Sequence, residues 1–426
     1  MKKIILPVTL TAFALFLTVV VVTTASPVRL FGDGRWFDPP CDISVAIAEV
    51  EMLKRGIDPY AVWNGDVIVK GYKSGRAANI PKDSVCRDDD EVVNVHPPWF
   101  YTAMLPLGLV PPRVASASQF FLMLGCLAYL IFLVRQRGIT LGLDPSESLA
   151  FGILSILAIA VPILQDFCSQ NWMIILLSAA ALMSACLNMG SRRGDIMAGI
   201  CWAVLMIKPQ TGLLFAIPLL MRRKFTTCIT AVLTCILMSI PPSLMCGTSP
   251  IDLIMVTPGS NSEQFWGCGT FPSFLTELIS KDFAIIIGLV IGAIICVALT
   301  RLLSNYDDWL FILMPAAICS MYWTYARCYS HVMGWFFFIC ISFALIKHPS
   351  SKLLWTLLAV ALPTMSRLYN AFHLAAAHLQ IQPFCTSSWA TEMFPLIDTL
   401  HSALGLIISI VFCIAIRHQA SSLRSI

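Results

Sequence analysis

Charged residues are scarce in this chain. Asp, Glu, Lys and Arg make up 12% of its 426 residues, whereas a typical soluble domain carries about 25%. The net charge is +4, and no basic tail offers a surface to a polyanion, so nucleic acid is excluded as a partner. A soluble enzyme and a disordered chain are excluded as well. With 58% hydrophobic residues, the chain is predicted to be an all-α polytopic membrane protein.

Metal-binding cysteine patterns are also missing. The 16 cysteines include no CxxC pair and no Cys/His zinc spacing. Most stand in apolar stretches, where a buried cysteine acts as a small hydrophobic side chain. Two pairs lie in polar segments, Cys41 with Cys86 and Cys246 with Cys268. Each pair forms a disulfide only if its compartment is oxidising and the two sulfurs are close, and the sequence does not give their separation.

Apolar blocks separated by short basic clusters predict about twelve membrane crossings. The first block is 4–25, interpreted as an uncleaved span, with a cleaved signal peptide as the alternative. The later blocks are 114–134, 149–165, 171–187, 196–207, 210–221, 226–245, 284–300, 309–325, 332–346, 353–366 and 398–416. Basic residues in short loops stay cytoplasmic, which places both termini in the cytoplasm. We therefore expect one transmembrane domain over 1–426, with 113–426 carrying the remaining spans.

The long polar segment 26–112 is predicted to be extracytoplasmic. It holds half of the 24 acidic residues. A helix-like stretch begins at Cys41-Asp42 and ends before Pro59-Tyr60. Asp42 stands where an N-cap residue would; alternatively, this carboxylate just outside the first span acts as a general base.

A second motif in this segment is His96-Pro97-Pro98-Trp99-Phe100. Two prolines begin a short helix without needing backbone donors, and aromatic residues suit a membrane interface. Residues 97–111 are therefore expected to form an interfacial or re-entrant helix. His96 either contacts a phosphate or an acceptor, or is an exposed loop histidine.

The apolar sequence between two basic clusters is interrupted at Lys208-Pro209-Gln210. Each half has about 12 apolar residues, roughly 18 Å of helix, which is less than a hydrocarbon core of about 30 Å. Lys208 is therefore predicted at the tip of two short helices, below the outer surface. An ionisable residue at that depth is a candidate functional group; alternatively, its ammonium extends to the outer headgroups.

Two further polar motifs fall on the same side under this threading. Gln170 and Asn171 occupy a turn between two blocks, where they hydrogen-bond sugar hydroxyls or cap the next helix. Arg327 and His331 stand among four aromatic residues at a helix end. Anchoring at the interface explains the aromatic residues, but it explains Arg327 and His331 less easily.

The order of these motifs resembles the membrane mannosyltransferases of glycosyltransferase family 87, in the GT-C superfamily. The resemblance covers residues 1–225 and then the stretch Ser320-Met321-Tyr322-Trp323-Thr324. Lys208-Pro209-Gln210 is moderately specific, and the combined order carries the resemblance. Two departures concern the turn, which in the family often has Gly-Gln-x-Asn, and His331, which follows Trp-Thr at a greater distance than usual.

The resemblance implies a GT-C-like fold and a reaction. A sugar, usually mannose, passes from a polyprenyl-phosphate carrier to a lipid or glycan acceptor on the outer face of the cell membrane, with inversion. Asp42 matches the family's general base, and His331 is a second candidate catalytic residue. The leaving group of this reaction is the polyprenyl phosphate, which needs cations or hydrogen-bond donors and no general acid. The candidate substrate-binding residues are Lys208, Gln210, Arg327, His96, Gln170, Asn171 and Tyr60.

This scheme requires no cofactor, although a divalent metal remains compatible with it. The alternative function is a multi-span transporter or a flippase of lipid-linked sugars. Such proteins carry charges near the midplane on broken helices, often within internal repeats. Here the polar groups gather at one face and no repeat is evident, which favours the transferase.

Overall fold

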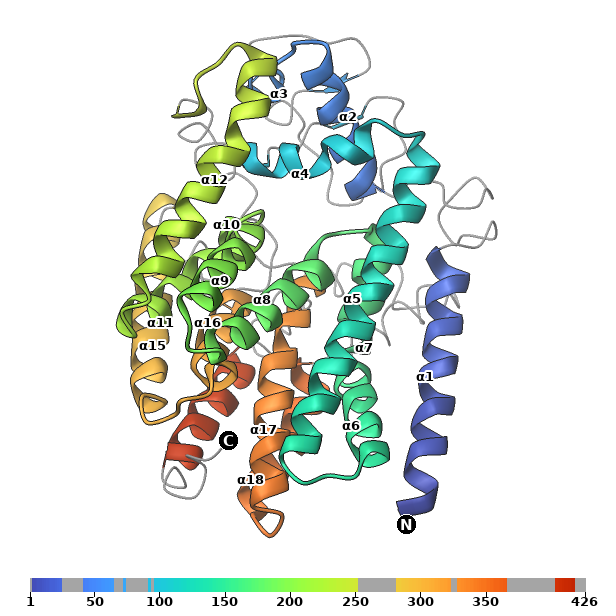
Figure 1. The fold of residues 1–426 in the computed structure, drawn as a ribbon, viewed down its shortest axis with the longest axis vertical. Coiled ribbons are helices and arrows are strands. Elements are labelled where there is room, and N and C mark those ends of the chain that lie inside the picture. Colours follow the sequence, from blue (N-terminus) through green and yellow to red (C-terminus); the bar gives the residue numbers. More distant parts are fainter. Residues whose placement is uncertain are drawn as a thin grey trace.

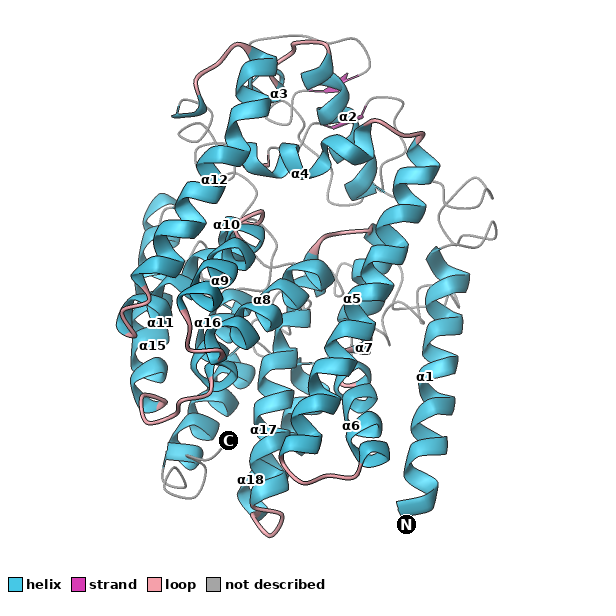
Figure 2. Ribbon diagram, viewed as in Figure 1, coloured by secondary structure: helices cyan, strands magenta, loops and turns pink. Residues whose placement is uncertain are grey.

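The structure is a computed structural model that describes residues 2–24, 41–64, 72–73, 91–92, 96–251, 281–322, 328–365 and 403–417. Helices joined by loops and turns make up these parts, together with the parallel two-residue strands β1 (Tyr72–Lys73) and β2 (Glu91–Val92) (Figure 2). The all-α class predicted from the composition is thus confirmed for them. Asp42 lies in a described helix, but its side chain does not belong to the described part.

The helices up to residue 221 are α1 (Lys2–Thr24), α2 (Cys41–Lys54), α3 (Pro59–Asn64), α4 (Pro98–Gly108), α5 (Pro112–Thr140), α6 (Pro145–Leu157), α7 (Ala160–Ser169), α8 (Met173–Asn188), α9 (Arg192–Leu205), α10 (Pro209–Gly212), η1 (Leu213–Phe215) and α11 (Ala216–Met221). The later ones are α12 (Phe225–Cys246), α15 (Lys281–Leu302), α16 (Trp309–Tyr322), η3 (Cys328–Gly334), α17 (Trp335–Lys347), α18 (Lys352–Met365) and a helix over 403–417.

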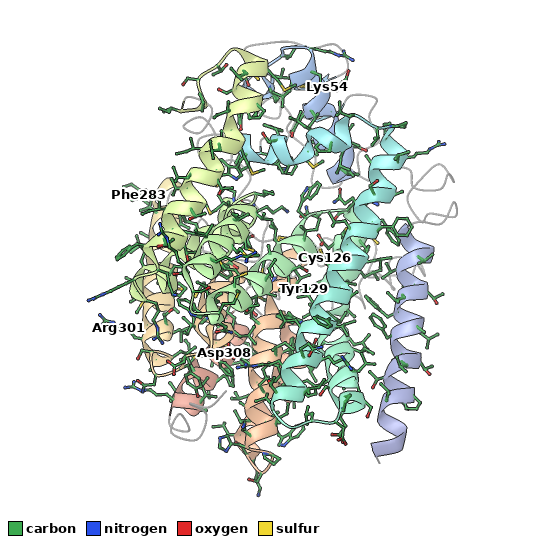
Figure 3. All side chains as sticks on the ribbon, in the orientation of Figure 1. Lys54, Cys126, Tyr129, Phe283, Arg301 and Asp308 are labelled. Atoms are coloured by element: carbon green, nitrogen blue, oxygen red, sulfur yellow. The ribbon has the colours of Figure 1, made fainter. Side chains whose placement is uncertain are left out.

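The molecule is elongated and its two ends differ. Helices α2, α3 and α4 gather at one end with the C-terminal end of α12, while α1 begins and the 403–417 helix ends at the opposite end (Figure 1). Lys54 marks the first end, and Arg301 lies in the half nearer the second (Figure 3). An even number of crossings, as predicted, would place both termini on one side.

Helix α4 lies across the general direction of α5 and α12 (Figure 1) and packs against both of them. Pro97 is its N-cap residue and Pro98 its first helical residue, which confirms the predicted proline start. A proline costs nothing there because the first amides of a helix have no intrahelical partner. Its predicted place at a membrane interface remains a prediction.

In the part of the chain that the structure describes, two helices are long and apolar enough to cross a membrane, α5 and α12. Both expose apolar side chains along their length, for example Phe121 on α5 and Leu237 on α12, as surfaces facing lipid do. Shorter apolar helices of 10–17 residues accompany them, including α8, α16 and part of α1. The predicted number of twelve crossings remains a prediction.

The apolar block at 149–165 does not form one straight helix. The chain divides there into α6 and α7, which meet at a bend of 62°. Ile159, between them, has φ −119° and ψ 27°. Pro162 explains the break, because its ring would clash with the carbonyl of residue 158 in a continuous helix. The pair is one broken span or a re-entrant segment.

The core is built around α16 and α17. Every residue of α16 is buried, as is nearly every residue of α17, which is expected for helices that are apolar on all sides. The described cysteines in apolar stretches are mostly buried too, among them Cys296, Cys319, Cys340 and Cys413. Their predicted role as small hydrophobic side chains is confirmed.

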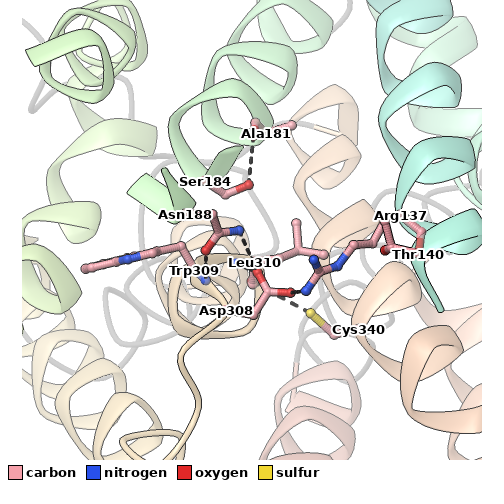
Figure 4. A network of polar contacts seen from close by, with 9 residues as sticks. All are labelled: Arg137, Thr140, Ala181, Ser184, Asn188, Asp308, Trp309, Leu310 and Cys340. Atoms are coloured by element: carbon pink, nitrogen blue, oxygen red, sulfur yellow. Dashed lines mark hydrogen bonds and ion pairs between the residues drawn. The ribbon is translucent and has the colours of Figure 1, made fainter. Parts of the chain in front are cut away.

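A buried carboxylate joins three helices at the end opposite to α4. Asp308 is 6% exposed and precedes α16, where it accepts a hydrogen bond from the backbone N–H of Leu310 at 3.0 Å, as an N-cap residue does. It also accepts from Nδ2 of Asn188 on α8 at 2.9 Å and pairs with the guanidinium of Arg137 on α5 (Figure 4). Asn188 Oδ1 in turn accepts from the N–H of Trp309 at 2.9 Å.

Replacing Asp308 with Ala is predicted to destabilise the fold. Arg137 and Asn188 would lose their shared acceptor, and breaking a buried ion pair on one side costs roughly 3–5 kcal/mol. The thermal unfolding midpoint in detergent should fall clearly. The neighbouring Asp307 is exposed, and Asp307→Ala should leave the midpoint unchanged; equal effects of the two substitutions would contradict this role.

Candidate functional site

The helix break predicted at Lys208 is present. α9 ends at Leu205, α10 begins at Pro209, and Lys208 is the N-cap residue with an extended backbone (φ −116°, ψ 92°). The proline imposes this conformation, because a residue that precedes proline is pushed out of the helical region. Lys208 is only 9% exposed, and its Nζ donates to Oδ1 of Asn171. The ammonium is therefore held inside the protein and does not extend to headgroups.

Two indole groups satisfy backbone carbonyls on either side of this break. Nε1 of Trp202 donates to the carbonyl of Gly212 at 2.8 Å, and Nε1 of Trp99 donates to the carbonyl of Met206 at 2.9 Å. Buried carbonyls that lose their helical partners need such donors. Trp99 belongs to α4, so its hydrogen bond links the break to this helix.

The turn before α8 carries a second set of polar contacts. Asp166 is fully buried, and its two carboxylate oxygens accept from the N–H groups of Met173 at 3.3 Å and Ile174 at 2.7 Å. A negative charge is stabilised at this helix end. Asn171 Oδ1 accepts from the N–H of Trp172 at 2.8 Å as well as from Lys208. Asn171 thus caps the turn and orients the lysine.

Gln170 is engaged in holding the turn together. It adopts a left-handed conformation with φ 48°. Its Oε1 accepts from Oγ of Ser116 at 2.9 Å, its Nε2 donates to the carbonyl of Ser116 at 3.2 Å, and its own carbonyl accepts from Nε2 of Gln119. All three residues are buried. Of the two predicted roles, these contacts support the structural one, which joins α5 to the turn before α8.

His331 lies at the same end of α8. The opposite ends of α8 and α16 are joined by Asn188 and Trp309, and both helices are roughly 21–24 Å long. Their other ends, at Met173 and Tyr322, are therefore near each other, and η3 packs against α7, α8 and α16. His331 in η3 is 1% exposed, with its ring edge-to-face with Tyr322 at 5.7 Å between centroids.

The 403–417 helix packs directly against the Tyr322 ring at Gly405. A Cβ at Gly405 would lie 2.1 Å from the Tyr322 hydroxyl oxygen, so only glycine allows this approach. Arg327, the predicted neighbour of His331, lies outside the described residues.

The third group of polar residues joins α2 to the start of α4. Glu49 on α2 is 0% exposed, and its Oε2 lies 2.9 Å from Nδ1 of His96. The His96 ring stacks on Phe100 at 4.0 Å between centroids. Tyr60 donates its hydroxyl to the His96 carbonyl, and the Tyr101 hydroxyl accepts from the His96 N–H at 3.4 Å. His96 is thus a half-buried, paired residue and not an exposed loop histidine.

Burial has electrostatic consequences in this group. Burial, then the nearby Glu49 carboxylate and then Tyr60, raise the pKa of Tyr101 well above its usual value. Burial also raises the pKa of Asp58, although the N–H groups of Tyr60 and Ala61 act against it. Burial and the Glu49 carboxylate therefore disfavour a negative charge on Tyr101, and burial disfavours one on Asp58.

Glu49 was not among the residues predicted from the sequence, although a signal exists. Buried positions of α2 include Ile43, Ala46, Val50 and Leu53, and position 49 falls within this apolar pattern. A carboxylate on the buried side of a helix is rarely tolerated unless it is paired. Asp42, in contrast, lies in the first turn of α2 and not at the predicted N-cap, because the helix begins at Cys41.

The predicted residues fall into two connected groups. Lys208, half-buried Gln210, Asn171, Gln170 and His331 surround the end of α8 that faces α4. The other group consists of His96 and Tyr60 with α2, the helix of Asp42. Figure 1 shows α4 between α2 and α10.

Other predicted features lie beyond the described part of the chain. Cys86, Cys268 and the Cys41 side chain are outside it, so the structure tests neither of the two possible disulfides. Within the described residues, no three His, Cys, Asp or Glu side chains are grouped closely enough to hold a metal ion.

Helices too apolar for water define a membrane protein, and the buried polar groups around Lys208, Asn171 and His331 form its candidate site. Residues 94–324 match the family model of glycosyltransferase family 87, which is more than half of the 426 residues. The chain belongs to this family and is a membrane glycosyltransferase that uses a sugar donor and an acceptor. The matched range includes His96 and Lys208 but begins after Asp42 and ends before His331.

No curated protein and no solved structure matches the chain.

The substitution Gln170→Gly distinguishes a structural role of Gln170 from a role in binding the sugar. Glycine tolerates the positive φ, but the buried Ser116 loses both side-chain hydrogen bonds, at a cost of roughly 1–3 kcal/mol. We expect a lower unfolding midpoint and unchanged binding of a polyprenyl-phosphate sugar. Ser169→Ala, which removes only bonds within α7, is the control. Weakened sugar binding with full stability would contradict the structural role.

Proposed function

We propose that the protein transfers a hexose, mannose by resemblance, from a polyprenyl-phosphate carrier to a lipid or glycan acceptor on the extracytoplasmic face of the cell membrane. The observation that carries this proposal is the buried Lys208 ammonium at the helix break, oriented by Asn171 in the turn before α8, the helix against which the η3 segment of His331 packs. A fixed cation in a protein-lined, apolar setting suits a ligand with a phosphate group.

The leaving group explains why cations are needed. As the bond between the sugar C1 and the phosphate oxygen breaks, negative charge increases on the polyprenyl phosphate. Lys208 is placed to compensate that charge from a site of low water content, where electrostatic interactions are stronger. His331 and Arg327 are proposed as further donors to the same phosphate, while Gln210 and Asn171 border it.

The acceptor needs a base. A sugar hydroxyl is a poor nucleophile, and Asp42 is proposed to take its proton as the oxygen bonds to C1 on the face opposite to the phosphate. The C1–O bond to the carrier breaks at the same time, and the products are an inverted glycoside and polyprenyl phosphate. One carboxylate is sufficient because the phosphate leaves without being protonated, unlike a glycosidase leaving group.

The orientation follows from the same assignment. α2 and α4 lie at one end of the molecule (Figure 1), and α10, with the Lys208 break before it, lies in the half nearer to them. Arg137 pairs with Asp308 and Arg222 donates to the Tyr306 carbonyl, so both lie beside the start of α16. Basic residues in short loops face the cytoplasm. The proposed site therefore faces the extracytoplasmic side, where a polyprenyl tail in the bilayer brings its phosphate to the interface.

Asp42→Asn is predicted to reduce transfer by about 10²–10⁴-fold, since general-base catalysis contributes about that much. Binding of the polyprenyl-phosphate sugar should persist, because the base acts on the acceptor. The assay is transfer by purified protein over a panel of lipid-linked sugars and acceptors. Asp58→Asn is the control in the same segment. Full activity of Asp42→Asn would overturn the assignment, and carrier movement in vesicles without transfer would favour a flippase.

Lys208→Met is predicted to weaken binding of polyprenyl phosphate about 10–100-fold, because a hydrogen bond to a charged group is worth roughly 1.5–3 kcal/mol. Folding should be retained, since an unbranched apolar side chain replaces a buried charge. The matched control is Lys224→Met; Lys224 pairs with Asp195 away from this site. Equal affinities for Lys208→Met and the wild type, measured by calorimetry, would contradict the role of Lys208.

A further inference from the structure

The segment that leads into α4 and forms its first turn, His96–Tyr101, contacts both halves of the proposed site. On one side, His96 Nδ1 lies 2.9 Å from Oε2 of Glu49 on α2. On the other side, Trp99 donates to the Met206 carbonyl, two residues before Lys208. Phe100 packs edge-to-face on Trp172 at 5.5 Å, beside Asn171. A six-residue segment, His96–Tyr101, thus connects the helix of Asp42 to the lysine.

Within this segment the side chains support one another. The His96 ring stacks on Phe100 at 4.0 Å, and its carbonyl accepts from Tyr60. The imidazole therefore has little freedom to follow a moving carboxylate. Glu49 is equally confined, because it is 0% exposed and α2 is packed on several sides. The contact with His96 offsets part of the desolvation cost of this buried carboxylate.

Position 49 also determines where position 42 lies. The two positions are two helical turns apart, roughly 10.5 Å along the axis, and on one face of α2. A contact that fixes the rotation and height of α2 at Glu49 therefore fixes its first turn. At the other end of α2, Lys54 Nζ lies 3.3 Å from the Gly108 carbonyl of α4. A Cβ on Gly108 would be 2.3 Å from Cγ1 of Val50, so the two helices are in direct contact.

We propose that Glu49 is a positioning residue for sugar transfer, which acts through His96 to hold the first turn of α2 at a fixed distance from the Lys208 break. Neither side chain takes part in the chemistry. The inference rests on the proposed function, in which Asp42 is the base. A displacement of about 1 Å of a reacting group costs about 10²-fold in rate, so a small rotation of α2 is sufficient to stop transfer.

The test compares Glu49→Ala with Glu51→Ala on the same helix. The Glu51 side chain is 38% exposed and, within the described part of the chain, forms surface ion pairs with Lys54 and Arg55, so its loss should change little. For Glu49→Ala we expect kcat to fall about 10²-fold, with unchanged affinity for polyprenyl phosphate. Hydrogen–deuterium exchange should increase in the first turn of α2 and remain unchanged in α8 and α9.

A milder pair of variants addresses folding and the route through His96. Glu49→Gln keeps an oxygen at the same reach and should retain most of the activity, whereas the shorter Glu49→Asp should lose it. If the residues act as a unit, Glu49→Ala combined with His96→Ala should be no slower than either variant alone.

Three results would overturn the inference. The first is wild-type kcat in Glu49→Ala while Asp42→Asn is inactive, which would leave the proposed function intact. The second is a faster exchange throughout the molecule in both Glu49→Ala and Glu49→Gln, which would show a general structural role. The third is rescue by Glu49→Asp but not by Glu49→Gln, which would show that charge matters and reach does not. An active Asp42→Asn would instead count against the proposed function.

Discussion

The break at Lys208-Pro209 is the constraint on which this end of the molecule depends. An interrupted helix in apolar surroundings leaves carbonyl groups and a charge that water cannot solvate. Neighbouring elements supply partners for these groups: Trp202 within α9, Trp99 from α4 and Asn171 from the turn before α8. The positions of α4 and α8 therefore follow from satisfying this interruption, and the polar end of the bundle forms around it.

The opposite end is organised in the same way by a charge of opposite sign. Asp308 gathers the ends of α5, α8 and α16, while the helices between the two ends contribute mainly apolar packing. Antiparallel helices of similar length that are fixed at Asp308 bring their other ends together near His331. The carboxylate at one end thus helps to determine which residues meet at the other.

Much of the fold could be predicted from the sequence. Apolar blocks indicate most helices, Pro97-Pro98 predicts the start of α4, and Pro209 predicts the break beside a lysine. The bend between α6 and α7 was missed because Pro162 stands inside an otherwise continuous apolar block. Hydropathy averaged over a span does not register a single ring that clashes with one carbonyl.

The site was harder to predict because its contacts join distant segments. Gln170 looked suited to a sugar, but its bonds to Ser116, which lies 54 residues away, use most of its hydrogen-bonding capacity. Glu49 was missed because one carboxylate in a short helix is usually on a solvated face. Its contact with His96, just before α4, shows that this carboxylate is buried and paired. Pairing across the chain is three-dimensional information that local periodicity does not contain.

The contact between Gly405 and Tyr322 has a consequence for the order in which the protein is made. Synthesis proceeds from the N-terminus, so α2, α4 and the turn at Lys208 are made early. The ring beside His331 is enclosed only when a glycine near the end of the chain arrives. Residues 2–365 of the described chain are therefore made before the helix that packs against the Tyr322 ring beside His331.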